Sequence, residues 1–322
     1  MKATSDAGAP GSADGGAPAV SVVIPTRNRE HLIAEAALNA LDQRGVDAEV
    51  VVVDDASTDG TAGVLEALGE PRLRIVRRRD QGRLAAARNS GIEAARGEWI
   101  AFLDDDDVWS PDKLALQLAA AEAAGAGFAY GGAITVDESL VPLHLWRLPP
   151  PDDLLRELLA LNVMPAGASN VLVRADLVRE LGGFDVDLSH TTDWDMWIRL
   201  AAASAGAAVP DVVVAYRLHQ QQESDRGREM LAELELIDAK HRDLRTELGV
   251  ELDRATFADY TRKRGKDPAD SAPEGDETRR PVAGSAARIS RRLRRALGRE
   301  EGNAVATPEW LRIRSAGVSR DA

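Results

Sequence analysis

Four consecutive aspartates, Asp104 to Asp107, directly follow the apolar run Trp99–Leu103. Such a run has the composition of a buried parallel strand, and ligands bind at the carboxyl ends of strands in open α/β sheets. Neighbouring carboxylates raise one another's pKa, so a cation is expected beside them. In an extended backbone Asp104 and Asp106 point to the same face, which suits Mg²⁺ or Mn²⁺. The alternative is a solvated acidic turn before the helix that begins near Pro111.

Two more polar loops follow apolar runs nearer the N-terminus. The loop Thr26–Arg29 comes after Val20–Pro25 and offers hydrogen-bond donors and two positive charges. After Val50–Val53 come Asp54 and Asp55, whose carboxylates could accept hydrogen bonds from a base or a ribose. A helix cap and turn is the alternative for this second loop. Because no glycine-rich phosphate loop is present, a nucleotide would be held by side chains and a metal ion.

These side chains need elements that bring them together, and strand and helix signals alternate over the first 160 residues. Strands are expected at 20–25, 50–55, 73–76 and 99–103, and helices at 30–43, 61–68, 84–95 and 111–124. The alternation predicts an α/β fold with a mainly parallel, doubly wound sheet flanked by helices. Right-handed crossovers then place the loops after Ile24, Val53 and Leu103 along one edge of the sheet.

The pattern changes from Phe128 onward. Further strands are expected at 128–136, 168–174 and 212–218, and further helices at 152–161, 194–203 and 226–248. Residues 262–287 are rich in Pro, Gly and charge, which indicates a linker or a disordered segment. Eight arginines and no acid occur between Arg279 and Arg299.

The overall charge and composition exclude several classes of protein. A net charge of −13 argues against a general nucleic-acid binder, and the absence of cysteine excludes disulfides and thiolate metal sites. No apolar run reaches the length of a membrane span, and residues 1–17 lack the apolar core of a signal peptide. A cytoplasmic location is therefore expected. The basic C-terminal segment is a candidate for peripheral contact with the inner face of a membrane.

The motifs, taken in order, resemble those of the family 2 inverting glycosyltransferases of GT-A fold. The resemblance covers about Ser21 to Ser224 and rests on these segments: Val22–Arg29, Val52–Thr61, Asp80–Gly91, Gly97–Asp107, Leu181–Asp185, Thr192–Leu200 and Tyr216–His219. It implies a Rossmann-like sheet with a smaller acceptor-side subregion and a helical C-terminal extension. It also implies transfer of a sugar from a nucleotide diphosphate sugar, in most members a UDP-sugar, to an acceptor hydroxyl of a glycan, cell-surface polysaccharide or glycolipid.

The resemblance also implies roles for individual residues. Asp55 would hold the nucleotide base, and Asp104 would contact the ribose or the sugar. Together the donor site would comprise Pro25, Thr26, Asn28, Arg29, Asp54, Asp55, Gly82, Arg88, Asn89, Asp104 and Asp105. Asp106 would bind Mn²⁺ or Mg²⁺, with His219 as a further ligand. Because a fourth aspartate is present, Asp105 and Asp107 form an alternative register for the metal motif.

The catalytic base implied by the resemblance is Asp193, which matches the acid of a Glu-Asp-Trp-Asp-type motif whose glutamate is replaced here by Thr192. From the residues alone, the cap of a helix that opens at Trp194 is the favoured interpretation of Asp193. Asp195 is a second candidate for the base. In the expected mechanism the metal ion stabilises charge on the leaving diphosphate, and the base takes the acceptor proton in a single inverting displacement.

The segments expected from this interpretation are a flexible tail (1–18), a GT-A domain (19–225), a helical extension (226–261) and a linker with a basic segment (262–322). Two other functions stay open: a catalytically silent scaffold that binds nucleotide sugars, and a polyprenyl-phosphate sugar transferase. Expected partners are the donor and a saccharide or lipid-linked acceptor.

Overall fold

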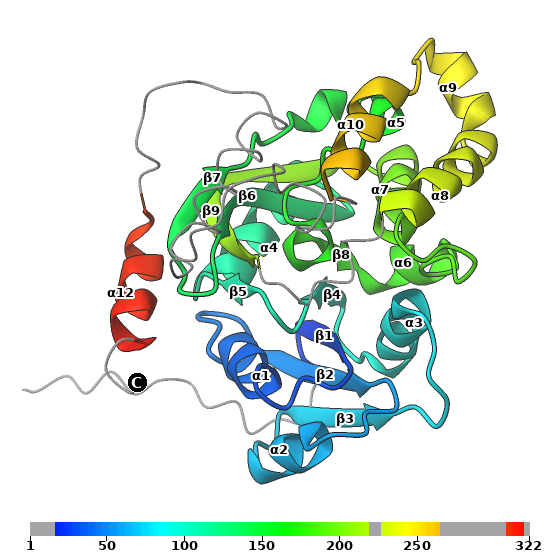
Figure 1. Cartoon of the computed structure of the whole chain (residues 1–322). Coiled ribbons are helices and arrows are strands. Elements are labelled where there is room, and N and C mark those ends of the chain that lie inside the picture. The colour runs from blue at the N-terminus through cyan, green and yellow to red at the C-terminus, as the bar shows by residue number, and fades with distance from the viewer. Residues whose placement is uncertain (1–16, 219–226, 265–306, 319–322) are drawn as a thin grey trace, which may run out of the picture.

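The computed structural model describes residues 17–218, 227–264 and 307–318. Within them the strands are β1 (Val20–Thr26), β2 (Ala48–Asp54), β3 (Leu73–Arg77), β4 (Trp99–Phe102), β5 (Val108–Trp109), β6 (Phe128–Val136), β7 (Pro142–Leu145), β8 (Leu172–Arg174) and β9 (Gly206–Arg217). These described strands form a single sheet in the order β3-β2-β1-β4-β8-β6-β9-β5, with β7 beside β6 (Figure 1).

The helices that follow the first strands are α1 (Ile33–Leu41), α2 (Thr61–Ala67), α3 (Leu84–Ala94) and α4 (Lys113–Ala124). Alternate residues of β1 face opposite layers: Val22 and Ile24 pack in the core that contains α1 and α4, and Val23 in the core that contains α3. Helix α3 lies very close to β1, because a Cβ on Gly91 would come within 2.2 Å of Val23 Cγ1. This close approach fixes the helix that carries Arg88 and Asn89.

The α/β prediction is confirmed, and the sheet is parallel across β3, β2, β1 and β4. Beyond β4 it is mixed: β8 pairs antiparallel with β4 and β6, whereas β6 and β9 pair in parallel. The sequence did not predict β5, β7 or the helix α6 (Ala175–Glu180), since these segments are too short to show periodicity. Residues 168–174, predicted as one strand, are a 3₁₀ turn (Gly167–Asn170) followed by β8.

The second half of the chain adds helices on the face that α3 covers. They are α5 (Leu154–Ala160), α7 (Thr192–Ala203), α8 (Gly227–Lys240), α9 (Arg242–Leu248) and α10 (Arg254–Arg264). Helix α12 (Glu309–Val318) packs elsewhere, in a cluster with residues of β5, β6 and β9. The prediction of one helix over 226–248 is wrong, because the chain breaks at His241, whose backbone leaves helical geometry. Helix α12 lies beside β9, with Trp310 Nε1 donating to Val212 O at 3.0 Å.

Several predictions fall on residues outside the described ranges: the tail at 1–16, His219, and the basic segment from Arg279 to Arg299. The boundaries expected at residues 18, 225 and 261 stay predictions. No helix within the described ranges is long and apolar enough to cross a lipid bilayer.

Candidate functional site

The ends of β1, β2 and β4 meet at one edge of the sheet, as the sequence predicts. Thr26 pairs in register with Asp54, and Val23 pairs with Phe102, so the loops that follow these strands lie next to one another (Figure 1). Pro25 is buried within β1. The acidic turn and the two polar loops therefore form one site.

Asp55 is held in place by two partners from the segment after β3. Arg78 Nε donates to Asp55 Oδ1 at 2.6 Å, and the N–H of Gly82 lies 3.0 Å from both carboxylate oxygens. A Cβ at Gly82 would come within 2.6 Å of Arg78 Nη2, so a larger residue there would require the Arg78 guanidinium to move. Arg78 was missed by the sequence reasoning, although its place just past the third strand was a usable signal. The contacts fix the orientation of the Asp55 carboxylate.

Asn28 and Asp54 connect the loops after β1 and β2. Asn28, with a left-handed φ of 52°, accepts a hydrogen bond at Oδ1 from Thr58 N at 2.8 Å, and its own N–H donates to Ser57 Oγ. Asp54 Oδ1 accepts a hydrogen bond from Ser57 N at 3.0 Å. These two predicted donor residues therefore also shape the loops that would surround a nucleotide.

The four aspartates form a turn, so the expectation of an extended backbone is wrong. Asp107 N donates to Asp104 O at 3.1 Å, which closes the turn. Asp107 is 2% exposed, and its carboxylate accepts hydrogen bonds from Ser169 Oγ and Arg217 N. These hydrogen bonds hold the Asp107 carboxylate inside the protein, so the chain turns here instead of continuing β4.

Asp105 is also held by the protein. Its carboxylate accepts a hydrogen bond from Thr26 Oγ1 at 2.6 Å and lies 3.5 Å from Arg29 Nε. Burial and the charge of Asp106 raise the pKa of Asp105 to about 7. Burial and the same neighbouring charge raise the pKa of Asp107 well above its ordinary value. Asp104, Asp105 and Asp106 are all partly exposed on this turn, but the Asp105 side chain, at 11%, is less exposed than that of Asp104, at 29%.

Arg88 and Asn89, neighbours on α3, hold two different segments. Arg88 Nη2 donates to Asp104 Oδ1 at 2.7 Å, and its guanidinium lies 5.3 Å from the centre of the Phe184 ring. Asn89 pairs with both backbone groups of Phe184, at 2.8 Å each. Asn89 therefore fixes the loop near Phe184, and Arg88 carries positive charge to the acidic turn.

Asp193 lies in the first turn of α7, one residue after the helix begins, so it is not the N-cap. Its Oδ1 accepts a hydrogen bond from Trp194 N at 2.7 Å. Burial raises the pKa of Asp193 and the charge of Asp104 adds to this effect, whereas Arg88 and the Trp194 N–H lower it. Asp193 is therefore within electrostatic reach of the acidic turn, with Arg88 acting on both.

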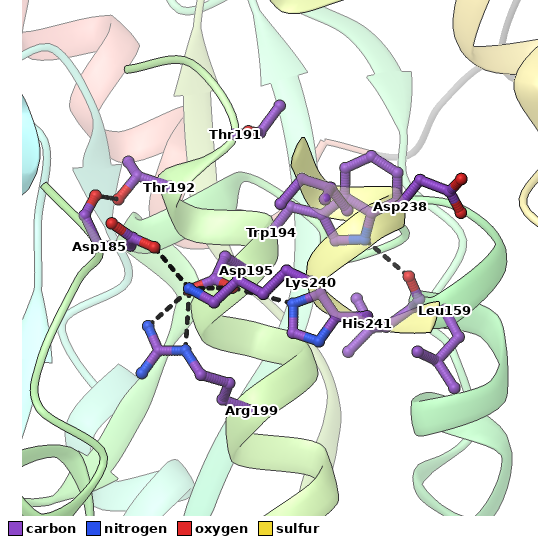
Figure 2. A network of polar contacts seen from close by, with 12 residues as sticks. Leu159, Asp185, Thr191, Thr192, Trp194, Asp195, Arg199, Asp238, Lys240 and His241 are labelled. Atoms are coloured by element: carbon purple, nitrogen blue, oxygen red, sulfur yellow. Dashed lines mark hydrogen bonds and ion pairs between the residues drawn. The ribbon is translucent and has the colours of Figure 1, made fainter. Parts of the chain in front are cut away.

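Asp195 is not available as a base. It is fully buried, and its carboxylate bonds with Arg199, Lys240 and His241 at 2.7 to 2.9 Å (Figure 2). Burial would raise the pKa of Asp195, but the hydrogen bond from His241 and the charges of Arg199 and Lys240 hold it well below its ordinary value. Trp194 and Trp197 are also buried, in agreement with a role in the core.

The donor atoms near the acidic turn fit a hard divalent cation. Asp104 and Asp106 provide carboxylate oxygens, the ligands that Mg²⁺ and Mn²⁺ prefer. Beside them, burial and then the charges of Asp106 and Asp104 raise the pKa values of Asp105 and Asp107. Within the described ranges, no three His, Cys, Asp or Glu side chains are grouped to hold a metal. The predicted ligand His219 lies outside those ranges.

Comparison with known proteins extends these observations. The succinoglycan biosynthesis protein ExoO of Rhizobium meliloti (strain 1021) is 46% identical over 115 residues, which are 35% of this chain and 32% of that protein. The Escherichia coli protein WfgD, named a UDP-Glc:alpha-D-GlcNAc-diphosphoundecaprenol beta-1,3-glucosyltransferase, is 25% identical over 221 residues, which are 68% of this chain and 85% of WfgD. The matched region spans about a third to a half of the length of two of its curated relatives.

The fold is similar to that of the mannosyltransferase PcManGT from Pyrobaculum calidifontis, solved in complex with GDP-Man and Mn²⁺. The TM-score is 0.56 at 19% identity, and the alignment covers 95% of this chain and 81% of PcManGT. The model of the family described as Glycosyl transferase family 2 matches residues 21–182, which are half of the chain and include the acidic turn. The chain belongs to glycosyl transferase family 2.

Proposed function

We propose that the protein is an inverting glycosyltransferase that moves a sugar from a nucleotide diphosphate sugar to an acceptor hydroxyl. The products would be glycans, cell-surface polysaccharides or glycolipids. The observation that carries this proposal is the place of Arg88, which donates to Asp104 on the acidic turn and also lowers the pKa of Asp193. A predicted donor-binding acid and a candidate base therefore both interact electrostatically with the same arginine.

The donor nucleotide would lie along the loops after β1, β2 and β4. Asp55, fixed by Arg78 and Gly82, is oriented to accept hydrogen bonds from the base. The Nε of Arg88 has no acceptor among the described residues, although Arg88 is only 3% exposed. A buried N–H without an acceptor is costly, and a phosphate or sugar oxygen of the donor would satisfy it.

We propose that Asp106, with His219, holds Mn²⁺ or Mg²⁺. The alternative register with Asp107 is disfavoured, because Asp107 is buried and already accepts hydrogen bonds from Ser169 and Arg217. A divalent cation at this place would supply positive charge for the diphosphate of the donor.

Asp193 would be the general base. Its Oδ1 is occupied by the Trp194 N–H, so Oδ2 would take the proton from the acceptor hydroxyl as that oxygen attacks the sugar. A single in-line displacement inverts the anomeric centre, and it needs no second nucleophile. Asp195 cannot replace Asp193, because its carboxylate is enclosed by three cationic or hydrogen-bonding partners.

A UDP-sugar is the proposed donor, in keeping with the name of WfgD, and a GDP-sugar is the second choice, in keeping with the ligand of PcManGT. The proposed acceptor is a saccharide or a lipid-linked saccharide. A cytoplasmic location, with peripheral membrane contact through the basic segment from Arg279 to Arg299, belongs to the same proposal. Nucleic acid is not a proposed partner.

The test is turnover with Mn²⁺ and UDP-glucose, UDP-N-acetylglucosamine or GDP-mannose, offered with simple saccharides and, separately, with polyprenyl phosphate. NMR of the product would give its anomeric configuration. We expect inversion relative to the donor with a saccharide acceptor, whereas retention would contradict the single displacement. Transfer only to polyprenyl phosphate would identify that class of transferase, and binding without any turnover would identify a scaffold.

A further inference from the structure

Helix α8 contributes a carboxylate that binds the backbone just before the helix of the proposed base. Glu233 accepts hydrogen bonds from three consecutive N–H groups, those of Ser189, His190 and Thr191, at 2.7 to 2.9 Å. It also accepts one from the Thr191 hydroxyl at 2.9 Å. Glu233 is only 9% exposed, so these four donors provide the solvation that its charge has lost.

The C-terminal end of α8 makes a second contact, with Asp195, which follows the proposed base Asp193 in the sequence. Lys240 Nζ lies 2.9 Å from Asp195 Oδ1 and 2.5 Å from Asp185 Oδ2. His241, where α8 ends, bonds with the same Asp195 oxygen at 2.9 Å (Figure 2). The break of the predicted long helix at His241 thus coincides with a contact to the first turn of α7.

A third contact comes from α10. Phe257 stacks on Trp194 with ring centroids 5.5 Å apart, and Trp194 Nε1 donates to Leu158 O at 2.7 Å. The residue next to Asp193 is therefore enclosed between α5 and α10. The helices after residue 226 pack against the start of α7 at three separate points.

We propose that Glu233 is a positioning residue for Asp193, and that α8 sets the place of the base by holding the chain on both sides of it. This proposal rests on the proposed function of Asp193. Glu233 binds residues two to four positions before Asp193, and Lys240 and His241 bind Asp195, two positions after it. Helix α7 begins at Thr192, and Glu233 brings a carboxylate from α8 to the residues just before it.

The physical reason is that a base acts only within hydrogen-bond reach of the proton it removes. A displacement of about 1 Å can lower a rate by about a hundredfold. Residues 189–191 lie between the Asp185 loop and α7 with no regular structure, so Glu233 supplies the hydrogen bonds that such a segment lacks. Acceptor-side catalysis thereby depends on a helix that the family model, which ends at residue 182, does not include.

The first experiment compares hydrogen exchange in the full-length protein and two variants, Glu233→Ala and Glu235→Ala. Glu235 lies on the same helix but is exposed and pairs with Arg254 of α10, so it is the matched control. We expect faster exchange at residues 189–195 in Glu233→Ala alone, with the sheet unchanged. Unchanged exchange at 189–195 in Glu233→Ala would overturn the proposal.

The second experiment is a double-mutant cycle of Glu233→Ala with Asp193→Asn, measured as UDP release when UDP-glucose is turned over with Mn²⁺ and a saccharide acceptor. If Glu233 acts through Asp193, it lowers kcat about ten- to a hundredfold with a small change in KM, and it costs nothing further in the Asp193→Asn background. Glu233→Gln keeps one acceptor oxygen and should recover part of the loss. Multiplicative losses would show that Glu233 acts elsewhere and would overturn the proposal.

The two experiments separate this proposal from the proposed function. If Asp193→Asn turns over normally, the assignment of the base fails, while the exchange experiment still decides whether Glu233 holds residues 189–191. If Glu233→Ala does not fold, Glu233→Gln takes its place in both experiments, with smaller effects in the same direction expected, and unchanged exchange at residues 189–195 or multiplicative losses would overturn the proposal.

Discussion

Arg88 Nη2 donates to Asp104 Oδ1 at 2.7 Å, and it does so from a side chain that is 3% exposed. The guanidinium also lowers the pKa of Asp193, which burial raises. Arg88 therefore brings a positive charge close to both acids. The ionisation of the proposed base therefore depends on a residue of α3, about a hundred positions earlier in the chain.

Replacing Asp193 tests the proposed base most simply. Asp193→Asn keeps the shape and an acceptor for the Trp194 N–H but cannot take a proton. We expect kcat to fall about a hundred- to ten-thousandfold, with nearly unchanged nucleotide affinity by calorimetry. Asp187→Asn, an exposed aspartate in the preceding loop, is the control. Normal turnover in Asp193→Asn would remove it from the role of base.

The raised pKa of Asp193 predicts how activity depends on pH. The base must be ionised, so kcat should fall as the pH drops through this pKa, at a higher pH than an ordinary aspartate would give. Arg88→Met removes the charge that lowers this pKa, so the acidic limb of the pH–rate profile should move to higher pH. A limb that stays in place would contradict the link between Arg88 and Asp193.

Arg78 predicts an effect on nucleotide binding that the sequence motifs do not include. Arg78→Met removes the charged partner of Asp55, so the carboxylate loses its fixed orientation. We expect donor nucleotide affinity to fall about tenfold or more, in line with the loss of a charge-assisted hydrogen bond. The neighbouring Arg77→Met is the control, because Arg77 is exposed and pairs with Glu66. Equal affinities for the two variants would contradict this role.

Two neighbouring aspartates should respond differently to substitution. Asp106→Ala should weaken nucleotide binding in the presence of Mn²⁺. The melting temperature should stay close to that of the wild type. Asp107→Ala removes the acceptor of the buried Arg217 N–H and Ser169 hydroxyl, so it should cost about 1–3 kcal/mol of folding stability. Thermal melts and calorimetry check both. If Asp107→Ala weakened metal-dependent binding and Asp106→Ala lowered stability, the alternative metal motif of Asp105 and Asp107 would be favoured.

The sequence predicts the parallel half of the sheet and its functional edge well, because strands and helices alternate there and each apolar run ends in a polar loop. Asp55, Arg88 and Asp193 lie in short motifs, so the sequence also predicts roles for them, and these roles stay predictions. It does not predict the bend of the acidic turn, since the partners that bury Asp107 are Ser169 and Arg217, 62 and 110 positions later. Such contacts leave no local pattern.

The contacts of the helices after residue 226 could not be predicted from the local sequence either. Their charge pairs resemble those of one exposed helix, yet His241 turns inward to Asp195 and ends α8. Glu233 lies among several acids, and nothing near it in the sequence indicates that it binds residues 189–191. Only the fold shows that it lies beside the proposed base, because the contacts join segments 42 to 46 positions apart.

The most direct test of the account is calorimetric binding of UDP, dTDP and GDP to the wild type and to Asp106→Ala, each with Mn²⁺ and with EDTA. We expect the wild type to bind one of these nucleotides, UDP first among them, only with Mn²⁺, and Asp106→Ala to bind it weakly even with Mn²⁺. Failure of the wild type to bind any of the three would contradict a donor site at this edge of the sheet. Equal binding with Mn²⁺ and with EDTA would contradict a role for the metal ion in nucleotide binding.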